Sequence, residues 1–467
     1  MRMSNESAAL YPSRTCFHCL HYRAFGSAVP WRGALASVWA RAARIRGSLR
    51  YYEFMKTLAI IGGGAAGLAA AVEAARESRR RSARMEITVY EASDRVGKSI
   101  LATGNGRCNL SNSAIDAAVY RNAEFVREAY RALPPEKVRS SFADLGLVMR
   151  EEAEGRIYPL TNKATSVLDV LRFAIRESGV RESCGTEVVA VTPVEERFLV
   201  CFADGGTVFA DAVILACGGG PAQSLLPPAY PYAGVLPVLG PLKTDVAPIK
   251  GLNNIRVRCE VSLYGRPCES GDKAAGRRKA LPSPSLKACE AGEVLFRDYG
   301  VSGIAIFDLS RFAEAGDVLS LDLVPETSED ALAADLSLRV ERFGSRGAVE
   351  LLSGMLLAPV ARAVCASIGM RADDPVARGR TADLACAVKS FRLEVRGAGD
   401  VRQCQVSRGG FEVAPFSPDT MESRLHAGLY VVGEALDIDA PCGGYNLHWA
   451  WTSGALAGRA AAGRCAP

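Results

Sequence analysis

Histidine is scarce in this sequence, with four residues in 467, and only His426 and His448 lie beyond residue 54. Neither lies in an arrangement with Ser and Asp that resembles a hydrolytic triad. We therefore expect catalysis to rest on a bound cofactor rather than on a side-chain nucleophile.

Closely spaced cysteines are also rare. The fourteen cysteines are scattered along the chain, and the one close pair, Cys16 and Cys19, is not followed by a second Cys/His pair at a zinc-ligand spacing. This pattern excludes a disulfide framework and predicts no metal site. Reduced thiols are typical of a cytosolic protein.

The sequence lacks a long uninterrupted apolar run. Its most apolar window, residues 351–370, contains Pro359 and Arg362 and is a poor membrane span. The first 54 residues contain no continuous apolar core of the length that a secretory signal needs. We expect a soluble, cytoplasmic protein without a membrane partner.

Basic charge is in excess only at the start of the chain. Residues 1–54 contain eight Arg, two Glu and no Lys or Asp, so the formal net charge of +5 leaves −1 for residues 55–467. A body this close to neutral argues against nucleic acid as a partner. We expect residues 1–54 to be an extension without a fold, although its Arg-rich composition leaves a targeting role open.

A glycine-rich motif follows the first apolar run. Leu58 to Ile61 leads into Gly62-Gly63-Gly64-Ala65-Ala66-Gly67, then into an Ala-rich helix and a second strand that ends at Glu91. In such a βαβ unit Gly62 permits the tight turn, Gly64 lets the backbone approach a pyrophosphate, and Gly67 lets the helix pack on the strand. The carboxylate of Glu91 is then placed to accept hydrogen bonds from an adenosine ribose.

Two later segments favour FAD over NAD as the dinucleotide. One is a buried strand that ends in Cys217-Gly218-Gly219, and the other is Gly428 to Glu434, followed by Gly443-Gly444-Tyr445-Asn446 and an Ala/Gly-rich helix. A cofactor contacted by segments this far apart is long and extended, as FAD is in a glutathione-reductase-like Rossmann domain. The last helix would direct its positive end toward the isoalloxazine. The chain contains no second complete dinucleotide-binding unit, so a pyridine nucleotide would bind only transiently at the flavin.

Between the segments that predict FAD lie alternating patterns of half-buried strands. They occur at residues 257–263, 319–323 and 393–395, and indicate a barrel-like β domain. Thr327-Ser328-Glu329-Asp330 reads as a capping box before a helical period. A helical insert is therefore expected within the β domain.

A long motif then indicates a family. The run Gly97-Lys98-Ser99-Ile100-Leu101-Ala102-Thr103-Gly104-Asn105-Gly106-Arg107-Cys108-Asn109, with Gly433-Glu434-Ala435-Leu436-Asp437 and Gly443-Gly444-Tyr445-Asn446-Leu447, resembles the signature of NAD(P)/FAD-dependent oxidoreductases. This family includes the BaiN-type bile-acid reductases and the aminoacetone oxidase family proteins. The resemblance spans about residues 58–462.

The resemblance implies an α/β fold in which a glutathione-reductase-like Rossmann FAD domain is split by an inserted β-barrel and a small helical domain. The expected parts are 55–245 and 405–467 for the FAD domain, 246–325 and 391–404 for the barrel, and 326–390 for the helical insert. Lys98 and Arg107 are expected to neutralise the pyrophosphate. Together with the glycine motif, the predicted cofactor-binding residues are Gly62, Gly64, Ala65, Ala66, Gly67, Glu91, Lys98, Ser99, Gly104, Asn105, Gly106, Arg107, Cys108, Asn109, Val188, Gly433, Glu434, Gly443, Gly444, Tyr445, Asn446 and Leu447.

The function that follows is that of an FAD-dependent oxidoreductase. The preferred form is a reductase that uses NAD(P)H to saturate an activated C=C bond in a small, steroid-like substrate. An amine oxidase that uses oxygen, a non-catalytic flavoprotein and an RNA-associated flavoprotein remain alternatives. His448, at the start of the last helix, is the candidate catalytic residue, with a packing role as the other interpretation; a redox pair of Cys108 and Cys442 also remains open.

Overall fold

The structure is a computed structural model that describes residues 55–266 and 285–465. The expected extension, residues 1–54, lies outside the described residues. No helix among the described residues is long and apolar enough to cross a membrane.

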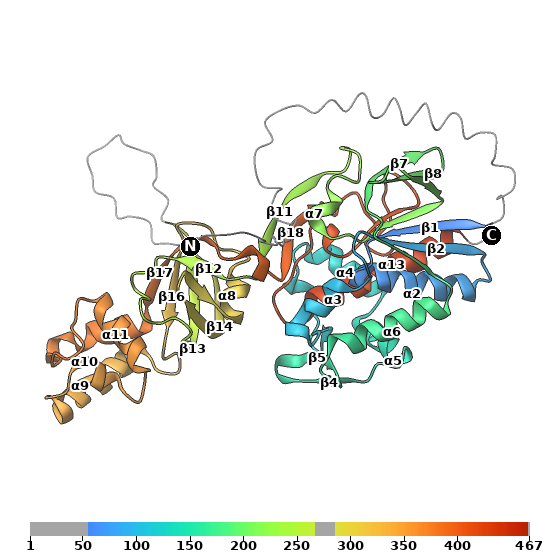
Figure 1. Cartoon of the computed structure of the whole chain (residues 1–467). Helices are drawn as coiled ribbons and strands as arrows, with labels where there is room; N and C mark the ends of the chain where they lie inside the picture. The colour runs from blue at the N-terminus through green and yellow to red at the C-terminus, as the bar shows by residue number, and fades with distance from the viewer. Residues whose placement is uncertain (1–54, 267–284, 466–467) are drawn as a thin grey trace, which may run out of the picture. The chain divides into compact units, whose positions relative to one another are not determined.

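A five-stranded parallel sheet forms the centre of the first part of the fold, with the strand order β19-β10-β1-β2-β6. Its strands β1 and β2 are labelled in Figure 1. Strand β1 is fully apolar from Leu58 to Ile61 because both faces of this parallel sheet are covered. The sheet and its crossover helix consist of β1 (Lys56–Ile61), α2 (Ala65–Arg80), β2 (Met85–Glu91), β6 (Arg181–Cys184), β10 (Ala212–Leu215) and β19 (Leu429–Val431).

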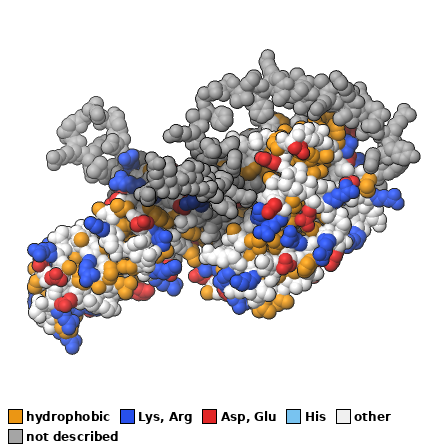
Figure 2. Space-filling model, in the orientation of Figure 1, with side chains coloured by type: hydrophobic (Ala, Val, Ile, Leu, Met, Phe, Trp, Pro, Cys, Tyr) orange, Lys and Arg blue, Asp and Glu red, His pale blue; other side chains and the backbone are white. Residues whose placement is uncertain are grey.

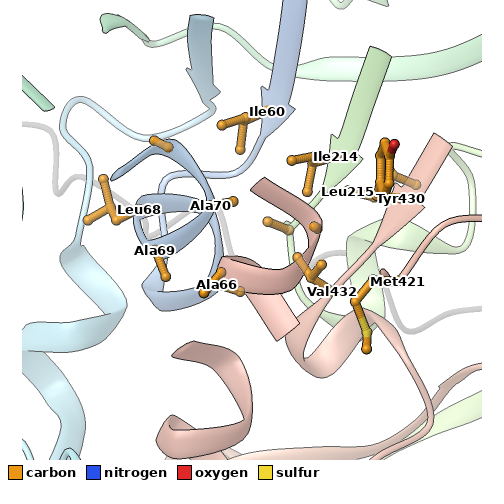
Figure 3. Close-up of a cluster of buried hydrophobic side chains, with 14 of the residues drawn as sticks. Ile60, Ala66, Leu68, Ala69, Ala70, Ile214, Leu215, Met421, Tyr430 and Val432 are labelled. Atoms are coloured by element: carbon orange, nitrogen blue, oxygen red, sulfur yellow. The ribbon is translucent and has the colours of Figure 1, made fainter. Parts of the chain in front are cut away.

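Helix α2 packs against the last helix, α13 (Tyr445–Arg464), through small residues. A Cβ atom built on Gly454 would overlap the carbonyl oxygen of Ala66, and one on Gly458 would overlap that of Ala70. Glycines four residues apart thus let the two backbones touch. Figure 3 shows Ile60 and Ile214 of the sheet together with Ala66 and Ala70 of α2, and all four belong to one buried cluster.

Short elements surround this sheet. The helices are α3 (Lys98–Ala102), α4 (Ala123–Ala132), α5 (Pro135–Asp144), α6 (Ala164–Glu177) and α7 (Gly219–Ala222). The strands form three small antiparallel sheets: β3 (Ser111–Asn112) with β5 (Arg156–Pro159) and β4 (Met149–Glu151); β7 (Val188–Val194) with β8 (Arg197–Phe202) and β9 (Thr207–Ala210); and β11 (Tyr232–Val238) with β18 (Val406–Phe411).

The second part contains a closed six-stranded barrel, in the order β12-β15-β14-β13-β16-β17. The alternation expected at residues 257–263 is confirmed, since Cys259, Val261 and Leu263 are buried between exposed or half-buried neighbours. The barrel elements are β12 (Leu242–Thr244), β13 (Arg256–Tyr264), β14 (Leu286–Arg297), β15 (Gly300–Ser302), α8 (Ile304–Leu309), β16 (Val318–Asp322) and β17 (Phe391–Ala398).

Four helices are inserted between β16 and β17. They are α9 (Glu329–Phe343), α10 (Ala348–Leu352), α11 (Ala358–Ser367) and α12 (Thr381–Lys389), and they share one buried cluster with the barrel. Ser328 caps α9 by accepting a hydrogen bond from the Ala331 amide at 3.3 Å. The cap is therefore one residue later than the motif starting at Thr327 predicted. The predicted fold class, a Rossmann domain interrupted by a barrel and a helical insert, is confirmed.

Candidate functional site

The glycine loop between β1 and α2 has the geometry that its sequence predicts. Gly62 has φ +103°, and a Cβ on it would lie 2.6 Å from the Ala216 carbonyl oxygen. A Cβ on Gly67 would overlap the carbonyl oxygen of Gly62. At Gly64, by contrast, the nearest protein atom to a built Cβ is Ser99 Oγ, at 3.3 Å. The backbone of Gly64 is thus accessible to a ligand, beside the first amides of α2.

Glu91 ties this loop to the end of β2. Its Oε2 accepts a hydrogen bond from the Gly63 amide at 2.8 Å, and its Oε1 accepts one from the Ser93 amide at 2.8 Å. The carboxylate is half-buried, so lone pairs remain for a ribose. The Glu91 carbonyl accepts from Thr186, two residues before Val188, which brings the predicted Val188 position to the same end of the sheet.

The segment with Lys98 and Ser99 reaches the glycine loop through Gly97, whose amide donates to the Gly63 carbonyl at 2.8 Å. Both side chains are exposed. Lys98 forms an ion pair with Asp94, four residues earlier in the chain. Lys98 therefore lies beside the glycine loop, as predicted, and its positive charge is paired with the Asp94 carboxylate.

The following loop, residues 104–109, is held by left-handed backbone: φ is +54° at Gly104, +55° at Asn105, +80° at Gly106 and +57° at Cys108. Arg107 stacks over Tyr158 at 4.0 Å from the ring centre and donates to both oxygens of Glu152 at 2.6 and 2.7 Å. The expected neutralisation of a pyrophosphate by Arg107 is therefore not supported, because Glu152 already balances this guanidinium.

The C-terminal turn meets the same loop. A Cβ on Gly444, where φ is +96°, would overlap the Ser111 carbonyl oxygen and lie 2.8 Å from Asn109 Oδ1. Asn446 holds the turn by bonding both ways to Ala440, accepting from its amide at 2.9 Å and donating to its carbonyl at 2.8 Å. Gly444 is thus required for the close approach of two protein segments. The approach of Gly443 and Gly444 to the flavin ring stays a prediction.

The turn after β19 contacts the first turn of α2. Gly433 has φ +63°, and its amide donates to Ser453 of α13 at 2.9 Å. A Cβ on it would lie 3.0 Å from the Ala66 Cβ. Glu434 accepts a hydrogen bond from the Ser407 amide, while burial raises its pKa. The segments that the sequence assigned to one site are therefore adjacent in space; Ala65, Tyr445 and Leu447 are partly exposed there.

His448 does not fit the catalytic role that the sequence suggested. Its side chain is 0% exposed, its Nδ1 lies 2.9 Å from Ser111 Oγ, and its Nε2 has no hydrogen-bond partner among the described residues. Burial lowers its pKa to about 3. His448 is thus a neutral packing residue that is surrounded by protein atoms.

A redox pair of Cys108 and Cys442 is also disfavoured. Cys108 is fully buried, which raises its pKa to about 11. Burial, and next the charge of Asp308, raise the pKa of Cys442 well above its ordinary value. Both groups remain thiols at neutral pH, whereas thiol exchange requires a thiolate. The fully buried Cys108 side chain is likewise unable to contact a cofactor.

One set of contacts beside the site was not predicted from the sequence. Asp439 is 1% exposed and binds two arginines, Arg311 Nε at 2.8 Å and Arg408 Nη2 at 3.0 Å. Asp308, at the end of α8, accepts from the Cys442 amide at 2.6 Å. These bonds connect the barrel to the turn before α13. Asp439 and Cys442 lie between the two C-terminal motif segments, and their partners lie more than 30 residues away in the chain.

The residues fit a bound FAD. The α2 amides and the accessible Gly64 backbone suit a pyrophosphate, Glu91 suits the ribose, and the buried Asn109 Oδ1 has no partner among the described residues. We found no group of three or more metal-ligating side chains within the described part of the chain.

Comparison with known proteins identifies the family of this chain. The model of the HI0933-like protein Rossmann domain matches residues 56–460. The chain belongs to this family. The family predicted from the motifs is confirmed, and with it the class of flavin-dependent oxidoreductase.

Two curated relatives carry different names. The 3-dehydro-bile acid delta(4,6)-reductase of Clostridium scindens is 33% identical over 421 residues, which cover 88% of this chain and 100% of the relative. The ribosomal RNA dihydrouridine synthase of Escherichia coli is 26% identical over 414 residues, which cover 84% and 95%. Among solved structures, a 3-ketosteroid-delta4-(5alpha)-dehydrogenase from Rhodococcus jostii has 16% identity and a TM-score of 0.42, with 90% and 98% of the chains covered.

Proposed function

We propose that this chain is an FAD-dependent reductase that accepts electrons from NAD(P)H and saturates an activated C=C bond in a small, apolar, steroid-like substrate. The observation that carries the cofactor is the accessible backbone of Gly64 at the start of α2, next to Gly63, whose amide binds the Glu91 carboxylate. The substrate class is supported by the relative named as a bile-acid reductase, which aligns over its full length.

The chain's own residues bind and orient. The positive end of α2 attracts the pyrophosphate, and Glu91 accepts from the ribose hydroxyls. The first amides of α13, starting at Tyr445, have no acceptor within that helix and would stabilise the negative charge that develops on a flavin ring bound beside them. A bound FAD would supply hydride transfer; the protein supplies position and electrostatics.

An RNA substrate is the second candidate, because two relatives are named ribosomal RNA dihydrouridine synthases. The formal charge of −1 on residues 55–467 argues against it. In the view of Figure 2, Lys and Arg side chains of the described residues lie among Asp and Glu rather than in one continuous basic area. We therefore propose a small-molecule substrate, with neither nucleic acid nor membrane as a partner.

The test is anaerobic stopped-flow reduction of the purified holoprotein. We expect NADH or NADPH to bleach the flavin absorbance, and an enone such as 4-androstene-3,17-dione to restore it faster than oxygen does. Reoxidation by oxygen alone, with an amine as the better reductant, would instead indicate the amine oxidase. Tight binding of residues 55–467 to ribosomal RNA at moderate salt would favour the RNA candidate.

A further inference from the structure

Saturating a C=C bond requires a proton as well as a hydride, so the proposed function, on which this inference rests, needs a proton donor at the substrate. The sequence suggested His448 as the candidate, but the His448 side chain is fully buried. Near the start of α13, Cys442 and Tyr445 are partly exposed and carry a proton at neutral pH, whereas the buried Tyr120 hydroxyl donates to the Tyr445 carbonyl. Their surroundings differ.

Cys442 is held in place by its neighbour Asp308. The Asp308 carboxylate accepts the Cys442 amide at 2.6 Å, and hydrogen bonding to the same carboxylate contributes to the raised pKa of the thiol. The thiol is mostly buried, and its Sγ lies 4.0 Å from Gln405 Oε1. Its proton is therefore directed into the junction with the barrel.

Tyr445 is oriented by rigid contacts. A Cβ on Gly443 would lie 2.8 Å from its Cε2 atom, so that glycine leaves room for the ring. The Tyr120 ring meets it edge-on at 6.2 Å, and the Tyr120 hydroxyl donates to the Tyr445 carbonyl at 2.8 Å. Tyr130 in turn donates to the Tyr120 hydroxyl at 2.8 Å. The ring thus has one preferred position.

The hydroxyl of Tyr445 takes no part in these contacts with Tyr120 and Tyr130. Its side chain is partly exposed, and its phenol oxygen forms no hydrogen bond with any residue in 55–266 or 285–465. Burial, and next the Asp308 charge, raise the pKa of Tyr445, which keeps the phenol protonated at neutral pH. A protonated, oriented and unpaired hydroxyl at the start of α13 has the properties of a general acid.

We propose that Tyr445 donates the proton in the reduction. As hydride adds to the β-carbon of the enone, the C=C electron pair moves toward the carbonyl. The electron pair at the α-carbon then takes the proton as the Tyr445 O–H bond breaks. Water returns a proton to the tyrosinate. NAD(P)H supplies the two electrons, so one hydride and one proton are consumed per bond saturated.

The test compares Tyr445→Phe with Cys442→Ala in holoprotein that has first been reduced with dithionite, so that NAD(P)H is not needed. Each is mixed with 4-androstene-3,17-dione under anaerobic conditions. We expect flavin reoxidation to slow by about 10²- to 10⁴-fold in Tyr445→Phe, the range for loss of general acid catalysis, and to stay near the wild-type rate in Cys442→Ala. FAD affinity and unfolding temperature should be unchanged in both, because Phe keeps the ring contacts.

A second measurement separates proton donation from a structural role. In deuterated water the wild-type reoxidation should show a solvent isotope effect and place deuterium on one face of the α-carbon. Tyr445→Phe should place it on both faces. Reoxidation of Tyr445→Phe at the wild-type rate, or loss of rate in Cys442→Ala alone, would overturn the inference. A reduced wild-type protein that does not react with the enone would contradict the proposed function itself, and the inference with it.

Discussion

Glu91 makes two kinds of contact at the residue scale, one to the protein and one available to a ligand. Its carboxylate binds the Gly63 and Ser93 amides, and thereby fixes the glycine loop before any ribose is present. A hydrogen bond to a charged group is worth about 1.5–3 kcal/mol. Replacement of Glu91 therefore affects both the loop and the cofactor.

We expect Glu91→Ala to weaken FAD binding by about 10- to 100-fold, and to lower the unfolding temperature of the cofactor-free protein. Titration of the apoprotein with FAD, followed by fluorescence quenching, measures the first effect. Glu86→Gln is the control, because Glu86 lies on the same strand but pairs with the surface residue Arg181. Equal FAD affinity in Glu91→Ala and Glu86→Gln would show that Glu91 does not bind the cofactor.

A site residue can be predicted from the sequence when a local motif determines its backbone conformation. It cannot be predicted when its side chain is paired with a residue far away in the chain. Gly62 and Gly67 are predictable because only glycine permits their contacts with Ala216 and with Gly62. The sequence predicts that Arg107 binds the pyrophosphate. Its actual partner, Glu152, lies 45 residues away, and no motif connects the two residues. His448 follows Asn446 by two residues in the sequence. Its position in the first turn of α13 directs its side chain into the protein, against Ser111.

At the scale of elements, the contact between α2 and α13 links the two ends of the first domain. Gly454 lies over the Ala66 carbonyl, at the first turn of α2, and Gly458 lies over that of Ala70. A methyl group at either position has no space unless the helices separate. Separation would also move the glycine loop relative to the start of α13.

We expect Gly454→Ala to lower the free energy of unfolding by about 1–3 kcal/mol, the usual cost of overpacking, although Ala has the higher helix propensity. Urea unfolding followed by circular dichroism measures it. Gly379→Ala is the matched control, because no atom lies within 4 Å of a Cβ at that position. A stability of Gly454→Ala equal to that of the control would mean that the helices are not in contact as described.

Element prediction from sequence succeeds where a period is long. The apolar run before Gly62 and the alternation over residues 257–263 become β1 and β13. Strand β3, by contrast, has two residues, Ser111 and Asn112, and no period can identify it. Its carbonyl at Ser111 nevertheless lies against Gly444, so part of the site depends on an element that only tertiary contacts define.

At the scale of the whole molecule, the first strand begins at Lys56 and pairs with β2 and β10 within the described residues. We therefore expect deletion of residues 1–54 to leave the unfolding temperature and the bound FAD unchanged. Thermal unfolding and the flavin-to-protein absorbance ratio of the purified proteins measure this. A loss of bound flavin on truncation would assign those residues a part in the fold.

The barrel and the Rossmann part are joined by the buried ion pairs of Asp439, and these make a pH-dependent contribution to stability. Burial alone would raise the pKa of Asp439, but hydrogen bonds from Arg408 and the charge of Arg311 outweigh it, so the net pKa is lowered. A lowered folded-state pKa means that ionised Asp439 stabilises the fold above the unfolded-state pKa of about 3.9. This stabilisation is lost as the pH falls through the lowered value.

We expect Asp439→Asn to destabilise the protein by about 3–5 kcal/mol at pH 7, because it leaves two partly buried arginines without a carboxylate. The difference between wild type and variant should begin to shrink as the pH falls below about 4, because the Asp439 carboxylate of the unfolded wild type then takes up a proton while that of the folded state, with its lowered pKa, stays ionised. Urea unfolding at pH 7, 5 and 3.5 measures both effects. Asp374→Asn is the control: Asp374 pairs with Arg371 at 4.0 Å on the surface, and exposed pairs of this kind contribute about 0–1 kcal/mol. A cost for Asp439→Asn that stays constant from pH 7 to 3.5 would show that the arginines are held by other groups, and that the carboxylate does not join the two parts.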